Sequence, residues 1–92
     1  MLSKEERYLV SFENCDYFLD LGVHIAFYRK RAGLTQQKLA DKLHIERTYL
    51  SRIESPGQNQ HFSFDLFFTI CRILNVPPKR FFEPFPNPDS KK

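Results

Sequence analysis

With 92 residues, the chain is sized for one small domain with a single core, which excludes an elaborate active site built on top of a scaffold. Its net charge of +3 suits a polyanionic partner, provided that the basic residues gather on one face. The N-terminal residues are charged and lack an apolar run, so we expect neither a signal peptide nor a membrane span.

The cysteines and histidines indicate no metal or catalytic site. Cys15 and Cys71 lie far apart and form neither a metal-ligand spacing nor a disulfide framework, which favours a reducing cytoplasm. His24, His44 and His61 fall in three different segments without ligand spacing. No sequence context activates a nucleophile. We therefore expect a cytoplasmic protein with no enzymatic activity, no cofactor, no metal and no small-molecule ligand.

Residues 1–20 leave two conformations open. The aromatic and β-branched residues at 8–12 are typical of a strand, whereas apolar residues between 2 and 12 can also share one helix face. Ser3 followed by Glu6 forms a capping box, which slightly favours the helix.

Residues 21–32 are predicted to form the first helix of the main body, closed by Gly33. Val23 and Phe27 add a second apolar stripe that needs a cover, and the nearest candidate is the segment 8–19. The principal apolar face, at spacings of four and three, consists of Leu21, Ile25 and Tyr28.

Residues 35–43 and 46–55 are predicted to form two short helices that cross at a tight turn. Thr35 can accept a hydrogen bond from a free N–H of the first turn. Ala40 leaves room for the two backbones to approach, because only a small side chain fits at such a crossing. The apolar residues that face one another are Leu39, Leu43, Ile45, Leu50 and Ile53.

The next predicted helix has an unusually narrow polar stripe, which implies burial on most of its sides. One apolar face carries Phe64, Phe67, Phe68, Cys71 and Leu74, and a second carries Leu66, Ile70 and Ile73. With Phe81, Phe82 and Phe85 following, the surplus of apolar residues predicts a self-association surface. The alternative is that the N-terminal segment covers these residues within one subunit.

Residues 34–53 resemble the helix-turn-helix domains of the phage repressor and Cro type, also called the XRE family. The likeness extends from residue 21 to about 82, with 62–76 similar to the fourth helix and 78–82 similar to the short fifth. Its strongest matches are Arg-Lys-Arg-Ala-Gly-Leu-Thr-Gln at 29–36, Leu-Ala-Asp-Lys-Leu at 39–43 and Tyr-Leu-Ser-Arg-Ile-Glu at 49–54.

This resemblance implies an all-α, five-helix, repressor-like DNA-binding domain over residues 21–85, with an extra N-terminal segment at 1–20 and a mobile tail at 86–92. The family usually has Gly in the turn, where this chain has His44. We expect His44 to adopt the left-handed backbone at a modest steric cost, because His is among the non-Gly residues that tolerate positive φ.

The resemblance also assigns contacts to the DNA backbone. Gln36 lies in the first turn of the second helix, whose free N–H groups suit a phosphate oxygen. Gln37 points about 100° away, so a solvated side chain is its alternative role. The amides of the loop 55–61 can bond phosphates but add no charge. The remaining backbone candidates are Lys30, Arg31, Gln58 and Asn59.

Base reading is expected from the polar face of the third helix, which carries Glu46, Arg47, Thr48, Ser51 and Arg52. Arg47 can bond guanine O6 and N7 in a bidentate manner, and Thr48 can meet a thymine methyl group or a base-edge acceptor. Arg52 suits either a base or a phosphate. Glu46 can accept a hydrogen bond from cytosine. Its alternative role is to start the helix, where the positive end of the helix dipole favours a carboxylate.

Arg29 and Glu54 receive a structural assignment instead. The resemblance places them where the family often forms an Arg–carboxylate pair between the first and third helices. Such a bidentate pair fixes the angle between the helices, and removing one partner leaves the other uncompensated.

We therefore expect a sequence-specific DNA-binding transcriptional regulator, with double-stranded DNA as its partner. Repression is favoured over activation, because a repressor needs only to occupy a promoter in order to block it. The sequence shows no recognisable ligand-binding module. We also expect a homodimer on a two-fold operator, because two reading helices multiply specificity. The C-terminal aromatic cluster is the first candidate for the dimer interface, and exchange of the N-terminal segment between subunits is the alternative. The rival hypothesis is an antitoxin-like or scaffold protein-interaction module on the same fold.

Overall fold

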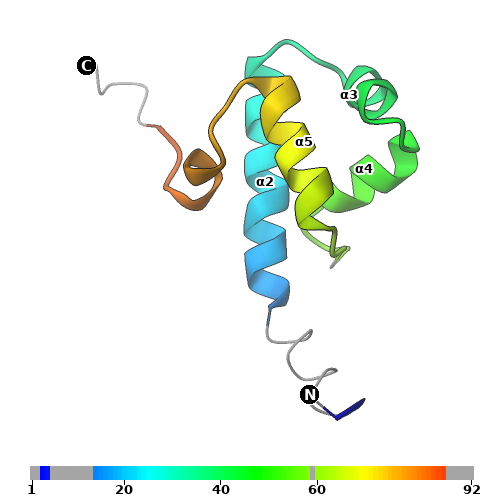
Figure 1. Ribbon diagram of the computed structural model, residues 1–92, viewed down its shortest axis with the longest axis vertical. Helices are drawn as coiled ribbons and strands as arrows, with labels where there is room; N and C mark the ends of the chain where they lie inside the picture. The colour runs from blue at the N-terminus through cyan, green and yellow to red at the C-terminus, as the bar shows by residue number, and fades with distance from the viewer. Residues whose placement is uncertain (1–2, 5–13, 59, 87–92) are drawn as a thin grey trace.

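The computed structural model describes residues 3–4, 14–58 and 60–86. This part of the chain is all helical, which confirms the expected class (Figure 1). The predicted short fifth helix is a 3-10 helix, and the other four are α-helices. The elements are α2 (Cys15–Arg31), α3 (Gln36–Leu43), α4 (Arg47–Glu54), α5 (Phe64–Leu74) and η1 (Pro78–Phe82).

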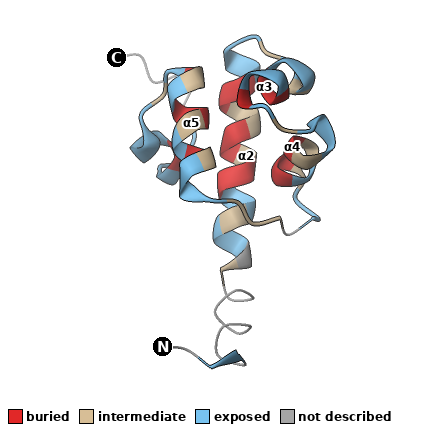
Figure 2. Ribbon diagram, turned by 45° about the vertical axis from the view of Figure 1, so that its right-hand side comes forward, coloured by how far each residue is buried: buried red, intermediate tan, exposed pale blue. Residues whose placement is uncertain are grey.

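α2 is the central element, and it contacts α4, α5 and η1. Figure 2 shows α5 on one side of α2 and α3 and α4 on the other, with the buried residues turned toward the space between them. No helix within the described ranges is long and apolar enough to cross a membrane. The side chains that are most fully buried are Ile25, Leu39, Leu50, Phe67, Ile70 and Phe81.

The first helix begins six residues earlier than the sequence predicted, at Cys15 instead of Leu21. The carbonyl of Asn14 accepts hydrogen bonds from the N–H groups of Tyr17 and Phe18, which starts the helix. Phe18 extends the apolar face of α2 by one turn, because it precedes Leu21 by three residues and packs its ring edge-on against Phe62. The choice between helix and strand at 8–12, and the capping box that includes Glu6, lie outside the described residues.

The apolar stripe on α2 is covered by the C-terminal segment. The rings of Phe27 and Phe85 lie 4.8 Å apart, and Phe85 also stacks on His24 at 4.2 Å. His24 Nε2 lies 2.7 Å from the carbonyl oxygen of Glu83 and Nδ1 lies 2.9 Å from that of Asp20, so the imidazole fixes this segment to α2. Phe27 is therefore covered at least in part by Phe85, while half of the segment 8–19, which the sequence offered as the cover, lies outside the described residues.

Several residues that were expected to form a self-association surface are buried within the subunit instead. Ile70 and Phe81 are fully buried, and Leu66 and Ile73 pack against the core. α2, α3 and the returning η1 segment pack against much of α5, so a chain of this length can bury most of its apolar residues. The large aromatic side chains that stay exposed on α5 and η1 are Phe64, Phe68 and Phe82.

Local signals define the ends of the helices, and two of them, at Thr35 and His44, were expected from the sequence. Thr35 Oγ1 accepts the N–H of Lys38 at 3.1 Å, and Ser63 Oγ accepts that of Leu66 at 3.1 Å. His44 closes α3 in the left-handed conformation, with φ of 58°, which confirms the prediction for the turn. Asn75 closes α5 in the same way, with φ of 59°.

A close helix crossing joins α2 to α4. Ala40 is fully buried, as expected for the α3–α4 crossing. Gly22 makes a closer approach, because a Cβ atom at this position would lie 2.0 Å from the carbonyl oxygen of Ile53. This contact, which no sequence pattern indicated, sets the distance between α2 and the end of α4.

Candidate nucleic-acid interface

The outer face of α4 brings together most of the residues predicted to read bases. Arg47, Thr48 and Arg52 are exposed, and Ser51 is half-buried. Leu50 and Ile53 turn the opposite face of the helix into the core. Glu46 is exposed at the N-cap, and its side chain makes no capping hydrogen bond. The polar face of α4 therefore stands free for a ligand.

Arg29 and Glu54 lie together as a buried, bidentate pair. Arg29 Nε and Nη2 each donate to a different oxygen of the Glu54 carboxylate at 2.8 Å. Arg29 Nη1 also donates to the carbonyl oxygen of Leu34 at 2.8 Å. Both side chains are less than a tenth exposed, so the pair ties α2 to the end of α4 and to the loop before α3.

Gln36 connects this pair to the reading face. Its amide nitrogen donates to Glu54 Oε1 at 2.9 Å, and its amide oxygen lies 3.5 Å from Arg47 Nη1. From the sequence, Gln36 was expected only as a phosphate contact, because no local pattern links it to residue 54 or to residue 47. Thr35 caps Lys38, which leaves the N–H groups of Gln36 and Gln37 without an acceptor within the helix. These two groups are available to a phosphate oxygen.

The loop after α4 is tied to the reading face through Arg52. Arg52 Nε donates to Gln60 Oε1 at 3.2 Å, and the guanidinium lies 5.8 Å from the centre of the Tyr49 ring. The spacing of three between Tyr49 and Arg52 was a signal for this contact, whereas nothing local pointed to Gln60. Gln58 is exposed, with its N–H bonded to the carbonyl oxygen of Ser55. Asn59 lies outside the described residues.

The remaining backbone candidates are less closely grouped. The Gln37 amide donates to Asp41 at 2.8 Å along the exposed side of α3. Lys30 is exposed near the end of α2. The Arg31 guanidinium lies 5.6 Å from the centre of the Phe27 ring. Because Arg31 follows Arg29 by two residues, or about 200° of helix, its side chain starts on the side of α2 away from α4.

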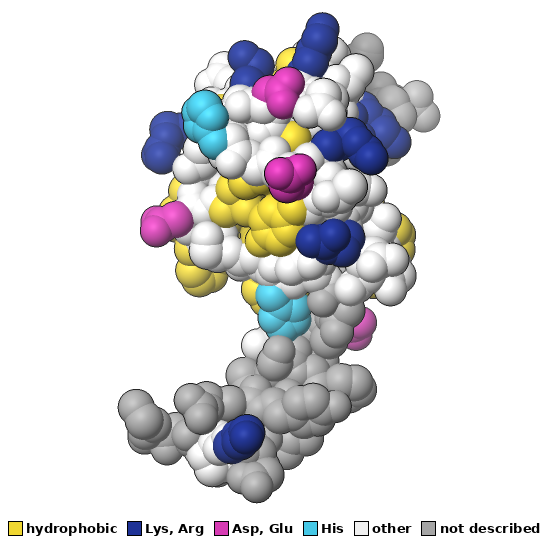
Figure 3. Space-filling model, turned by 90° about the vertical axis from the view of Figure 1, so that its right-hand side faces the viewer, with side chains coloured by type: hydrophobic (Ala, Val, Ile, Leu, Met, Phe, Trp, Pro, Cys, Tyr) yellow, Lys and Arg dark blue, Asp and Glu magenta, His cyan; other side chains and the backbone are white. Residues whose placement is uncertain are grey.

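The charge on this face is mixed. Figure 3 shows Lys and Arg side chains around the rim, Asp and Glu side chains between them, and apolar side chains near the centre. Glu54 is paired with Arg29, so the exposed acidic side chains on α3 and at the start of α4 are Asp41 and Glu46. The exposed basic side chains on α3 and α4 are Lys38, Lys42, Arg47 and Arg52. The excess of positive charge suits a phosphate backbone without forming a continuous basic patch.

Comparisons with known proteins bear on the same part of the chain. A family model described as a helix-turn-helix domain matches residues 20–81. The chain is 33% identical over 64 residues to a protein of Acinetobacter baylyi named competence pilus inhibition repressor. The matched region is 70% of this chain and 56% of that relative, so the chain spans little more than half of the relative's length.

Proposed function

This chain belongs to the helix-turn-helix domain family, and from that premise we propose that it is a sequence-specific DNA-binding regulator of transcription. The observation that carries the proposal is the arrangement of α3 and α4. Their packing leaves Arg47, Thr48 and Arg52 together on one exposed face, beside the free N–H groups at the start of α3. This is the arrangement that a helix needs to read base edges in the major groove.

In this proposal α4 enters the major groove and α3 lies across the phosphate backbone. Arg47 near the start of α4 donates to guanine O6 and N7, and Thr48 contacts a thymine methyl group or a base-edge acceptor. The N–H groups of Gln36 and Gln37 bind a phosphate at the positive end of α3. The Gln36 side chain, held by Glu54, fixes the distance between the two contacts.

We propose further that the protein represses as a homodimer and resembles the phage repressor, or XRE, type. A two-fold dimer places two reading helices about 34–36 Å apart on one face of the duplex, which multiplies specificity. Repression requires only occupancy of a promoter, and the related Acinetobacter baylyi protein is named a repressor. We place this activity in the cytoplasm, where the target DNA is accessible.

The rival proposal is a protein-interaction module on the same fold. It is favoured by three aromatic side chains that remain exposed on α5 and η1, namely Phe64, Phe68 and Phe82. The two proposals differ in their dependence on Arg47. A module that binds only protein does not need an arginine at the start of α4.

Arg47→Ala is expected to relax the base preference at one position of each half-site, at a cost of about 1–3 kcal/mol for the preferred base. The measurement is selection of duplexes from a random library, followed by mobility shift at several salt concentrations. Binding of the parent protein should weaken with salt, with a slope of log K against log salt of about −0.9 per neutralised phosphate.

Lys79→Ala is the matched control, because Lys79 is exposed on η1, outside the proposed contact surface. This variant should select the same sequence as the parent protein. If Arg47→Ala also selects the parent sequence with the same stringency, Arg47 does not read a base. If the parent protein shows no sequence preference at any salt concentration, the regulatory proposal is wrong.

A further inference from the structure

The solvent face of α5 carries aromatic side chains that the proposed DNA contact does not use. Phe64 is 69% exposed and Phe68 is 43% exposed, although both belong to a helix whose other face forms the core. Their rings stack on each other with centroids 5.7 Å apart, so they form one continuous apolar ridge. Phe82 extends the apolar area, since it is 62% exposed and packs edge-on against Phe67.

Two opposite charges lie on the same face of α5. Asp65 and Arg72 are seven residues apart, which is almost two turns, so both point to the same side of the helix about 10 Å apart along its axis. Both residues are exposed. Among the residues that the structure describes, neither side chain forms a hydrogen bond or an ion pair. One end of the ridge is therefore acidic and the other basic.

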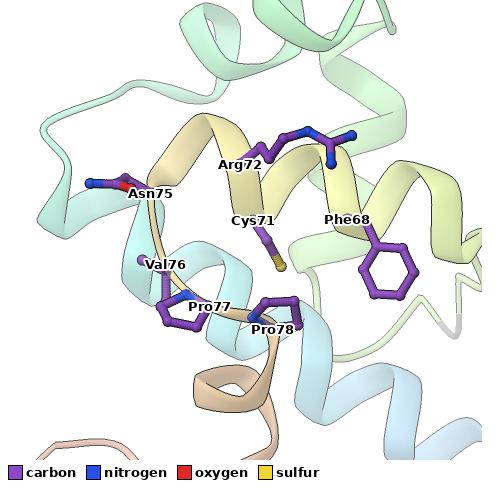
Figure 4. Close-up of a pocket in the computed structure, with 7 residues that line it drawn as sticks. All are labelled: Phe68, Cys71, Arg72, Asn75, Val76, Pro77 and Pro78. Carbon is purple, nitrogen blue, oxygen red and sulfur yellow. The ribbon is translucent and has the colours of Figure 1, made fainter.

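An open groove lies beside the basic end of this face. Figure 4 shows it between the C-terminal half of α5 and the segment that leads to η1, and its volume is about 500 Å³. Burial raises the pKa of Cys71 to about 11, so its thiol stays neutral within the lining. The lining is apolar apart from the side chains of Arg72 and Asn75. It consists of Phe68, Cys71, Arg72, Asn75, Val76, Pro77 and Pro78.

These features complement one another when two copies of α5 pack antiparallel. A two-fold axis midway between residues 68 and 69 places Asp65 opposite the partner's Arg72 and, by symmetry, Arg72 opposite the partner's Asp65. This two-fold axis runs perpendicular to both helices and lies in the plane where they touch. The rotation therefore places each flank of one α5 beside the same flank of the partner's α5. Phe64 and the groove share a lateral side of α5, so Phe64 of each copy meets the groove of the other.

We propose that this face, formed by Phe64, Asp65, Phe68 and Arg72 with the groove beside it, is the surface on which a second copy of this chain docks. The inference rests on the proposed homodimer and identifies its contact. Two Asp65–Arg72 pairs fix the antiparallel register, while the buried aromatic rings supply the apolar contact. The reading helix stays outside this contact, because the residues of the contact belong to α5 and the segment that follows it, and none belongs to α3 or α4.

Charge reversal tests the register directly. Asp65→Arg places two arginines at each predicted pair, and Arg72→Asp places two aspartates there, so each variant alone should dimerise at least about tenfold more weakly than the parent. An equimolar mixture of the two variants places opposite charges at both pairs and should recover the dimer. The measurement is sedimentation equilibrium of the full chain without DNA, from about 1 to 100 µM, a range that covers typical weak and moderate affinities.

Lys38→Glu is the matched charge reversal at an exposed residue of α3 that is not part of this face, and it should dimerise like the parent protein. Far-UV circular dichroism of each variant shows whether α5 still folds. A monomeric parent over the whole range overturns the inference, as do two single variants that dimerise normally or a mixture that stays monomeric. Selection of DNA sequences by the parent protein and by the two α5 variants is a separate readout. A dimer without sequence preference contradicts the proposed function, whereas a sequence-specific monomer contradicts this interface.

Discussion

Arg29→Ala is expected to lower the free energy of unfolding by about 3–5 kcal/mol, because it leaves a carboxylate buried without its counter-charge. In the parent protein, Glu54 accepts two hydrogen bonds from Arg29 and one from Gln36. The variant keeps only the Gln36 amide as a donor to that carboxylate. The carbonyl of Leu34 loses a donor as well. Equilibrium urea denaturation of the parent and the variant measures the difference.

Lys30→Ala removes an exposed cation from the next position of α2 and should change stability by less than about 0.5 kcal/mol. Arg29→Met combined with Glu54→Leu removes both charges and should recover much of the loss. A variant Arg29→Ala that unfolds like Lys30→Ala contradicts the structural assignment. If that variant also loses DNA binding, Arg29 is a contact residue.

Gly22→Ala is expected to cost about 3 kcal/mol, although alanine favours a helix more than glycine does. The new Cβ atom would lie 2.0 Å from the carbonyl oxygen of Ile53 and 3.1 Å from its carbonyl carbon. Both are backbone atoms, so they cannot rotate away as a side chain can. α2 and the end of α4 must therefore separate, which also disturbs the Arg29–Glu54 pair.

Gly57→Ala serves as the control, because a Cβ atom there has no heavy atom within 4 Å. It should leave the unfolding midpoint unchanged within about 0.5 kcal/mol. Thermal melting followed by circular dichroism compares the two variants. Helix propensity alone predicts that Gly22→Ala is the more stable protein, so an increase in its melting temperature would refute the close crossing of α2 and α4.

The sequence predicted α3 and α4 well because their signals are local. Thr35 is adjacent to the helix that it caps, and His44 is one of the few residue types suited to the left-handed turn. The start of α2 was predicted too late, since the apolar spacing was followed only from Leu21. Phe18 precedes Leu21 by three residues and continues the same face.

Contacts between distant segments could not be predicted in the same way. Phe85 covers Phe27, and His24 contacts the carbonyl of Glu83, across more than fifty residues of sequence. No periodicity within either segment indicates which of them meet. For the same reason the surplus of apolar residues on α5 was recognised, but Ile70 was counted as surface although it is fully buried.

The candidate site was predictable as a list of residues and not as a network. Arg47, Thr48 and Arg52 follow from their place on the polar face of α4. The role of the Gln36 side chain between Glu54 and Arg47 depends on how α3, α4 and the turn fold together. The contact of Arg52 with Gln60 depends likewise on the path of the loop.

The most direct test of the proposed DNA contact is amide chemical-shift mapping of the 15N-labelled protein, titrated with its selected duplex and with a scrambled duplex of the same composition. With the selected duplex, we expect the largest changes at Gln36, Gln37 and along the exposed face of α4, with smaller changes on the solvent face of α5. The scrambled duplex should produce weaker changes that disappear as salt rises. Changes confined to α5 and η1, or identical responses to both duplexes, would contradict the assignment of α3 and α4 as the surface that reads DNA.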